Sequence, residues 1–455
     1  MKELRLPSNW FAGIQWLFFI FSNIIVIPIT IGAAFSLSQE ETIPLIQLSF
    51  IVTGIACILQ AFLGHQRAIM EGQSGLWWGV ILTVITTASA QGVSMEEVGG
   101  SLTVGVLLSG GLTVLIGLAG WGPRLALLFN SSVMGVFMFL FGCQLIGIFM
   151  KGMLGIPFGQ HTPSGHINVT ISLLSILIAI FVMIITVKAP APISRYSLLI
   201  GIIVGWILYE IIFKPNNGIS STQPESYKIF PLGSPTWNSG IIITAVLTGI
   251  LNTANTFGAL KGTDEFYGNH TTKQQYRASF TLTGISTCIA ALFGLVPYAP
   301  YVSSIGFLKQ TAIYRILPFA LGGAMFLMMG VIPIIGQFFS LLPLSIGSAV
   351  LFVAYLQLLG SLWNFFKEVE FSTMNVYRLG IPIFCGIIIM TMPEYNFESL
   401  PETIQPLISN GLLVGISLSL IMENVFKEKN NFRKSVSNDM QVKVSDEGNK
   451  TQTGR

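Results

Sequence analysis

The sequence has 455 residues, of which 52% are hydrophobic and only 9% are charged, and its net charge is +3. Soluble domains carry about 25% charged residues because their surface faces water, so this composition excludes a soluble globular protein. A bilayer accommodates such a chain, since each helical span needs about 20 mostly apolar residues. The small net charge gives no indication of a nucleic-acid partner, and membrane lipid is the expected surrounding.

Fourteen apolar runs are long enough to be membrane spans, and Gly, Pro or charged residues separate them. We therefore predict an all-α, multi-pass membrane protein. Polar and glycine residues interrupt the third and the tenth of these runs. In chain order, the predicted spans are 11–34, 44–63, 68–90, 102–121, 127–150, 169–187, 194–213, 239–261, 278–297, 301–315, 316–336, 341–364, 378–393 and 405–424.

The positions of Lys and Arg predict the topology, because cytoplasmic loops carry an excess of both. With fourteen spans and the N-terminus inside, 20 of the 23 Lys and Arg residues fall inside; only Lys151, Lys214 and Lys228 fall outside. We expect a cytoplasmic N-terminus at 1–10. We also expect a cytoplasmic tail at 425–455, whose polar and charged composition predicts disorder.

One long external loop, 214–238, divides the spans into two halves, 11–213 and 239–424, with seven spans each. Halves with an odd number of spans must have opposite orientations in the membrane. Many secondary transporters are built from such inverted repeats. The span count therefore predicts a seven-plus-seven inverted repeat.

Residues that could carry catalysis are scarce. The four Cys are far apart in the sequence and lie in apolar segments, so we expect buried hydrophobic side chains rather than disulfides or metal ligands. The four His fall in predicted loops, and the sequence contains no metal-ligand cluster, nucleophile elbow or phosphate loop. We predict no enzyme activity, no cofactor, no metal and no ATP-driven transport.

Three polar segments break the apolar pattern, at 71–75 in the third span, 252–258 in the eighth and 297–306 entering the tenth. Irregular backbone at membrane depth is tolerated only where it lines a cavity or is buried in protein. Broken helices also aim backbone N–H groups at a ligand. The third and the tenth spans are each the third span of their half. These breaks predict a central binding site.

Alternative roles remain open for individual residues. Gly and Ser in spans often serve close helix packing. Glu71 is a candidate for ion coupling, because a carboxylate inside a span is a functional candidate. It also lies four residues after Arg67, near the cytoplasmic end of the span. A salt bridge to Arg67, or a position that lines the cytoplasmic entrance to the site, is therefore an equal alternative to ion coupling. Trp77 and Trp78 have two alternatives, a place in the site or a place against lipid or between packed helices, and we expect the second.

Several stretches of the sequence carry a family resemblance: Gly13-Ile14-Gln15-Trp16 with Val26-Ile27-Pro28, Ala254-Asn255-Thr256-Phe257-Gly258-Ala259-Leu260, and 297–314 with Ile305-Gly306 and Thr311. Over residues 10–425 the chain resembles the nucleobase–ascorbate transporters, also called xanthine/uracil permeases or nucleobase:cation symporter-2. The resemblance implies fourteen spans in two inverted repeats, with a core domain and a gate domain. It also implies short strands in spans three and ten that meet at the substrate, and a homodimer joined through the gate domains.

The chain departs from the family pattern at the site itself. The family usually has Glu or Asp at the position of Asn255, Glu or Gln at Ser303 and glycine at Val302. An asparagine both donates and accepts hydrogen bonds, which suits the mixed edge of a purine or pyrimidine, but it cannot exchange a proton. Glu71 is the remaining carboxylate near the predicted site.

We predict a secondary permease of the cell membrane for nucleobases, chiefly purines such as xanthine-like bases, that works by alternating access and is coupled to a proton or sodium ion. The alternatives are an uncoupled nucleobase facilitator, a sulfate-carrier-type anion transporter and a membrane receptor that transports nothing. Phe257 and Tyr301 are the candidates for stacking on the base. The predicted substrate-binding residues are Gln73, Ser74, Gly75, Asn252, Asn255, Phe257, Tyr301, Val302, Ser303 and Ser304.

Overall fold

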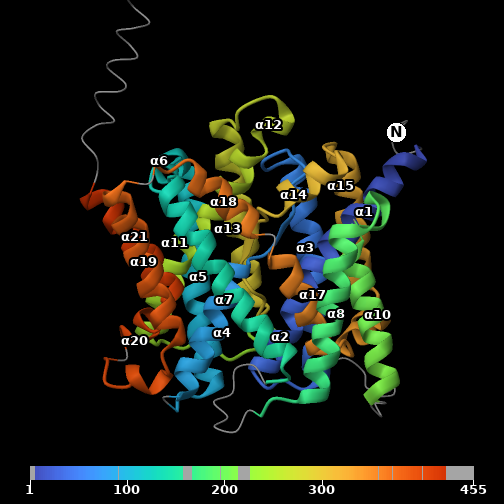
Figure 1. Cartoon of the computed structure of the whole chain (residues 1–455), viewed down its shortest axis with the longest axis horizontal. Helices are drawn as coiled ribbons and strands as arrows, with labels where there is room; N and C mark the ends of the chain where they lie inside the picture. Colours follow the sequence, from blue (N-terminus) through green and yellow to red (C-terminus); the bar gives the residue numbers. More distant parts are fainter. Residues whose placement is uncertain are drawn as a thin grey trace, which may run out of the picture.

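The structure is a computed structural model that describes residues 6–426, except for 91, 157–165, 195, 214–225, 357, 371 and 402. Nearly all of the predicted tail at 425–455, and the first half of the predicted external loop, lie outside the described residues. The described chain forms a layer of helices (Figure 1). The start of the first helix and the end of the last one lie at the same side of this layer, as an even number of spans requires.

The first half of the chain contains one short strand among its helices. Its elements are α1 (Pro7–Ile24), α2 (Val26–Ala34), α3 (Gln39–Phe62), β1 (Glu71–Gln73), α4 (Gly75–Ala90), α5 (Met95–Ala119), α6 (Gly122–Ala126), α7 (Ser131–Met153), α8 (Val169–Lys188), α9 (Ala191–Ser194) and α10 (Ser197–Phe213).

The second half also contains one short strand. Its elements are α11 (Ser239–Gly262), α12 (Asp264–Tyr267), α13 (Lys273–Leu292), β2 (Tyr298–Pro300), α14 (Ser304–Thr311), α15 (Ile316–Val331), α16 (Pro333–Ser340), α17 (Leu344–Leu356), α18 (Leu358–Lys367), α19 (Thr373–Thr391), the 3-10 helix η2 (Glu394–Phe397), α20 (Gln405–Ile408) and α21 (Gly411–Val425).

The helices account for the predicted spans. Among the described residues, seven helices are long and apolar enough to cross a membrane, or eight if the bent pair α15 and α16 is one span, and four shorter helices are apolar. The two remaining spans are α13, which is more polar, and the strand-and-helix segment formed by β2 and α14. The fold is therefore the predicted mostly helical one, with strands in the third and tenth spans.

Helix packing repeats between the two halves. Helix α5, the fourth span, packs along α13 and α11, the second and first spans of the other half. Helix α15, the fourth span of the second half, packs along α3 and α1, the second and first spans of the first half. Exchanging the two halves maps one set of contacts onto the other, which is the arrangement of an inverted repeat.

Glycines allow the closest of these contacts in both halves. A Cβ at Gly284 of α13 would lie 2.7 Å from the carbonyl oxygen of Gly110 in α5. At the matching crossing, a Cβ at Gly54 of α3 would lie 2.6 Å from the carbonyl oxygen of Gly323 in α15. Small residues let helix backbones approach where lipid offers no hydrophobic driving force. The spans of this group, one to four and eight to eleven, form the core domain.

The other spans form the gate domain. Helix α7 packs against α17, α18, α21 and α19, while α8 packs against α10 and α17. The gate meets the core through fewer elements, among them α4 with α7 and α2 with α17. The two groups of helices are thus the parts that could move relative to each other.

The eleventh span is shorter than predicted. The sequence predicts that it continues to 336, but α15 ends at Val331 and the chain bends by 84° into α16. Pro333 lacks a backbone N–H and its ring clashes with a preceding helical carbonyl, so it starts a new helix instead. The residue before a proline avoids helical dihedrals, and Ile332 is extended, with φ −89° and ψ 108°.

Replacing Gly54 with alanine should destabilise the core, because the new methyl group would overlap Gly323 and the Leu327 side chain. Overpacking of this kind costs about 1–3 kcal/mol. The measurement is the thermal unfolding midpoint of the purified protein in detergent. Gly380→Ala in α19 is the matched control, because a Cβ there meets nothing within 4 Å. Equal midpoints for the two variants would contradict the close crossing.

Candidate functional site

The two interrupted spans meet through their strands. Strands β1 and β2 pair in antiparallel orientation. The pairing continues beyond the strands, since Ser74 N donates to Pro297 O at 2.7 Å and Tyr301 N donates to Met70 O at 2.8 Å. Each span thereby satisfies main-chain groups of the other at a depth where water is scarce. The paired residues are Glu71 with Pro300, Gly72 with Ala299 and Gln73 with Tyr298.

Asn252 of α11 joins both interrupted spans. Its Nδ2 donates to the main-chain oxygen of Tyr298 at 2.9 Å, and its Oδ1 accepts from the Ser74 hydroxyl at 2.7 Å. The same oxygen accepts from Asn255 Nδ2 at 3.0 Å. All three hydrogen bonds are buried, so this amide fixes α11 to the strand pair.

Asn255 lies one helical turn further along α11 and is 8% exposed. Its bond to Asn252 uses one amide hydrogen. Among the described residues, its carbonyl oxygen and second amide hydrogen have no hydrogen-bond partner. Asn255 is therefore the amide of the pair that can bond a ligand.

The two faces of β1 have different surroundings. Gln73 points toward α3, where its Nε2 donates to the Ser49 hydroxyl at 2.7 Å. Gly72 faces the opposite way, and its missing side chain leaves room for the Tyr301 ring, 3.0 Å from where a Cβ would be. The Tyr301 hydroxyl donates to the main-chain oxygen of Gln73. This bond fixes the ring beside the strand pair.

Gate helices lie directly against the start of α4. A Cβ at Gly75 would lie 2.9 Å from Phe141 Cζ and 3.2 Å from Leu145 Cδ1, both on α7. Tyr355 of α17 meets Phe141 edge-on, with ring centroids 6.3 Å apart. The helix that follows β1 thus begins at the contact between core and gate.

Three predicted residues follow β2 and have different environments. Ser304 is buried, and its hydroxyl accepts from Met70 N at 3.1 Å, so it fixes the start of α14 to the residue before β1. Ser303 is exposed at the N-terminus of α14. Val302 is half-buried and lies 3.3 Å from where a Cβ of Gly258 would be. Ser303 is the one of the three with a freely accessible polar side chain.

Phe257 packs among other rings. Its ring centroid lies 5.2 Å from that of Phe280, 5.6 Å from Tyr276 and 6.1 Å from Phe129. These rings join α11 to α13 and to the segment before α7. Of the two candidates for stacking on a ligand, Phe257 thus lies in a packed cluster of rings, whereas Tyr301 lies at the strand pair.

Glu71 is fully buried inside the core. One carboxylate oxygen accepts from Gln60 Nε2 at 3.1 Å, and the other accepts from the Thr283 hydroxyl at 2.8 Å. The salt bridge considered between Glu71 and Arg67 is absent, because Arg67 bonds Asp264 at 2.8 Å instead. Strand alternation explains the difference, since it turns the Glu71 side chain between α3 and α13.

Arg67 is a buried anchor for the segment that leads into β1. Besides its bond to Asp264, it donates to the main-chain and side-chain oxygens of Asn269, and its guanidinium lies 5.1 Å from the Tyr267 ring centroid. Nearby, burial and the charge of Arg67 lower the pKa of His65 to about 3, so this imidazole stays neutral. Its Nδ1 accepts from Arg67 N at 3.1 Å.

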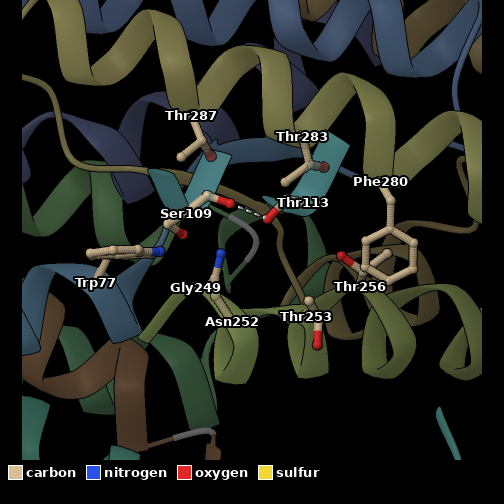
Figure 2. A pocket seen from close by; sticks show the side chains of 10 residues that line it. All are labelled: Trp77, Ser109, Thr113, Gly249, Asn252, Thr253, Thr256, Phe280, Thr283 and Thr287. Atoms are coloured by element: carbon tan, nitrogen blue, oxygen red, sulfur yellow. Dashed lines mark hydrogen bonds between the residues drawn. The ribbon is translucent and has the colours of Figure 1, made fainter. Parts of the chain in front are cut away.

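A small cavity lies within the core domain, and its free space suits a water-sized molecule rather than a base. Helices α11 and α13 provide opposite walls (Figure 2). The side chain of Trp77 is one wall and Trp78 is also buried, so both tryptophans pack inside the protein and neither faces lipid. The lining residues are Trp77, Ser109, Thr113, Gly249, Asn252, Thr253, Thr256, Phe280, Thr283 and Thr287.

The polar breaks in the sequence do not single out most of these hydroxyl groups. Ser109 and Thr113 are four residues apart on α5, and Thr283 and Thr287 are four apart on α13. Residues four apart lie on one face of a helix. Pairs of hydroxyl residues at this spacing in apolar spans are the sequence pattern from which this polar cavity lining could have been predicted. Among the described residues, no three His, Cys, Asp or Glu side chains come together as metal ligands.

A family profile described as a permease family, and named for xanthine and uracil, matches residues 8–395. The chain belongs to the xanthine/uracil permease family. The family and the relatives below are permeases and not enzymes, so this is a multi-pass membrane protein of the nucleobase–ascorbate transporter type, as its sequence predicts.

Curated relatives extend over nearly the whole chain. YwdJ of Bacillus subtilis, provisionally named a purine permease, is 30% identical over 91% of this chain and 95% of its own length. The xanthine permease of the same organism is 21% identical over 91% of this chain and 92% of its own. The uric acid transporter UacT of Escherichia coli is 23% identical over 91% and 85%. These names do not favour a sulfate-carrier-type function.

Solved structures show the same fold at low identity. The transmembrane domain of the cyanobacterial bicarbonate transporter BicA is 14% identical, with a TM-score of 0.61 over 91% of this chain and 96% of that one. SLC26A9 is 13% identical, with a TM-score of 0.58 over 92% of this chain and 66% of that one. The likeness confirms the seven-plus-seven inverted repeat.

Asn252→Ala should lower the thermal unfolding midpoint, because the Ser74 hydroxyl and the Tyr298 carbonyl would lose a buried partner. Leaving such groups unpaired costs about 1–3 kcal/mol each. Asn255→Ala removes one bond and should change the midpoint much less. Thermal unfolding of both variants without substrate makes the comparison, and a larger drop for Asn255→Ala would contradict the anchoring role of Asn252.

Proposed function

We propose that this chain is a secondary active permease for purine bases, coupled to a cation and working by alternating access. The curated relatives carry the names of purine, xanthine and uric acid permeases. The observation that carries the proposal is that Asn255, next to the amide that joins the third and tenth spans, keeps one amide hydrogen and its carbonyl oxygen for a ligand. Hydrogen-bonding groups at the join of two interrupted spans are the expected form of a central transport site.

The base would bind between Asn255 and the ends of the strands. Asn255 offers an acceptor and a donor from one side chain, which matches a purine edge that carries both a carbonyl and a ring N–H. The starts of α4 and α14 follow the two strands, and main-chain N–H groups at helix starts bond ligand oxygens. We expect Ser303 and the main chain at Gln73 to Gly75 to add further bonds.

Tyr301 is the ring that we expect to stack on the base. It lies beside Gly72, and its hydroxyl is bonded to the main chain of β1, so the ring is held in place. Flat heterocycles gain affinity from an aromatic ring at a fixed position. Phe141 on the gate side could close over the base when the two domains approach.

We propose that both ends of the chain face the cytoplasm. The positions of Lys and Arg favour this orientation over the reverse, with 20 of them predicted inside and three outside. The described ends lie at the same side of the helix layer as α6 and α12 (Figure 1). On this orientation the Arg67 anchor lies at the cytoplasmic end of the third span.

Purified protein in proteoliposomes should take up labelled xanthine or uric acid faster than protein-free vesicles do, and unlabelled purine should compete. Labelled uracil and bicarbonate are the comparison substrates, chosen to separate a purine permease from a pyrimidine or anion carrier. Uptake of bicarbonate without any uptake of purine would contradict the proposed function.

Asn255→Ala should reduce purine uptake at subsaturating concentration about 10- to 100-fold. Losing one or two hydrogen bonds to a buried ligand costs about 1.5–3 kcal/mol, and each 1.4 kcal/mol is tenfold. Asn424→Ala, at an exposed position near the end of α21, is the matched control and should transport like the unchanged protein. Unchanged uptake by Asn255→Ala would place the base elsewhere.

A further inference from the structure

Glu71 is a carboxyl group with neutral partners. It is fully buried, and its two oxygens accept from the Gln60 amide and the Thr283 hydroxyl. Its main-chain oxygen accepts from the Cys57 thiol at 3.2 Å. An ionised carboxylate taken out of water without a counter-charge is strongly disfavoured, so such a group either binds a cation or carries a proton.

Among the described residues, the Glu71 carboxylate bonds Gln60 and Thr283 and no basic side chain. Arg67, the nearest Arg in the sequence, bonds Asp264 and Asn269 at the end of α11. The titratable groups that face Glu71 from neighbouring elements are the Cys57 thiol of α3 and the Tyr298 phenol of β2. From α13, the groups that reach this cluster are hydroxyls and main-chain oxygens, namely Thr283 and the oxygen of Ser279.

A proton fits this site better than a multivalent metal ion. No three acidic, His or Cys side chains come together anywhere in the described part of the chain, so a divalent cation would lack the ligands that it needs. A proton requires one carboxyl group and hydrogen-bonding neighbours, and Glu71 has both.

The hydroxyl-lined cavity connects Glu71 with the amide that organises the substrate site. Thr283 donates to Glu71 and also lines the cavity, and Asn252 lines the same cavity from α11 (Figure 2). The buried Ser109 hydroxyl, 2% exposed, also lines it and has no partner among the described residues. A polar cavity of this size holds a water molecule when several hydroxyl groups surround it.

We propose that Glu71 is the proton-binding residue of this permease. The inference rests on the proposed function, because it names the cation that moves with the purine. On binding, an O–H bond forms on the Glu71 carboxylate as the Thr283 hydroxyl gives up its proton and takes another from a hydronium ion in the cavity, which is left as water. On release the same bond breaks and the proton returns to water. One proton moves with each base, and no other reactant takes part.

This assignment explains how the chain can couple transport without a carboxylate at Asn255 or Ser303. The proton would bind behind the strand pair, on the α3 and α13 side, while the base binds in front of it. The Glu71 and Asn252 sites are linked by β1 itself and by the cavity, so each can respond to the occupancy of the other.

Proteoliposomes with an acidic outside solution and a more alkaline inside provide the transport test. The unchanged protein should accumulate xanthine above the outside concentration, up to about tenfold for one pH unit and one proton per base. Glu71→Gln, a neutral variant of the same size, should still exchange labelled for unlabelled xanthine but should lose accumulation. Glu265→Gln, an exposed carboxylate on α12, is the matched control and should accumulate normally.

Two transport results would overturn the proton assignment while leaving the purine permease intact. One is full pH-driven accumulation by Glu71→Gln. The other is accumulation by the unchanged protein that follows a sodium gradient and ignores the pH gradient. Failure of the unchanged protein to take up or exchange any purine would instead contradict the proposed function.

Infrared difference spectra between acidic and alkaline conditions test the proton site without any purine. The unchanged protein should show the carbonyl band of a neutral carboxylic acid in a dry environment, and Glu71→Gln should lack it. Thr283→Val should shift this band because it removes a hydrogen bond, whereas Thr283→Ser should keep it. A band of unchanged intensity in Glu71→Gln would overturn the assignment of the proton to Glu71.

Discussion

The antiparallel pairing of β1 with β2 is the interaction on which the rest of the structure depends. In the hydrocarbon region an unpaired N–H or C=O group costs several kcal/mol, so a helix cannot be interrupted there unless another backbone replaces its hydrogen bonds. Here two interrupted spans, one from each half of the chain, supply each other's partners. Each strand leads into a helix, α4 after β1 and α14 after β2, at opposite ends of the pair, and a binding site becomes possible between the two domains.

The remaining core contacts keep this pair in place. Glycines at equivalent crossings bring α5 against α13 and α3 against α15, so the helices that surround the strands are packed at backbone distance. Asn252 then ties α11 to both strand spans, and Arg67 ties the segment before β1 to the residues after α11. A core held in this way can move as one body against the gate, which is what alternating access between two domains requires.

Sequence alone was sufficient for the number of spans, the inverted repeat and the breaks in the third and tenth spans. These features follow from hydrophobicity, from the distribution of Lys and Arg, and from Gly, Pro and polar residues within spans. The partners of single side chains did not follow, because Arg67 and Asp264 are 197 positions apart and no local pattern joins them. The different roles of Asn252 and Asn255 could not be predicted from the sequence either, since they depend on which of the two amides bonds the strand spans. The early end of α15 could have been anticipated from Pro333.

The strand pair also bears on how such permeases diverge. Its hydrogen bonds join peptide groups, so they make few demands on the side chains that flank the strands. Residues such as Val302 and Ser303 can therefore drift while the pairing persists, and Asn255 can change as long as Asn252 keeps its bonds. Transporters with this architecture can therefore change substrate specificity through a few side-chain substitutions, while the backbone that positions those side chains stays the same.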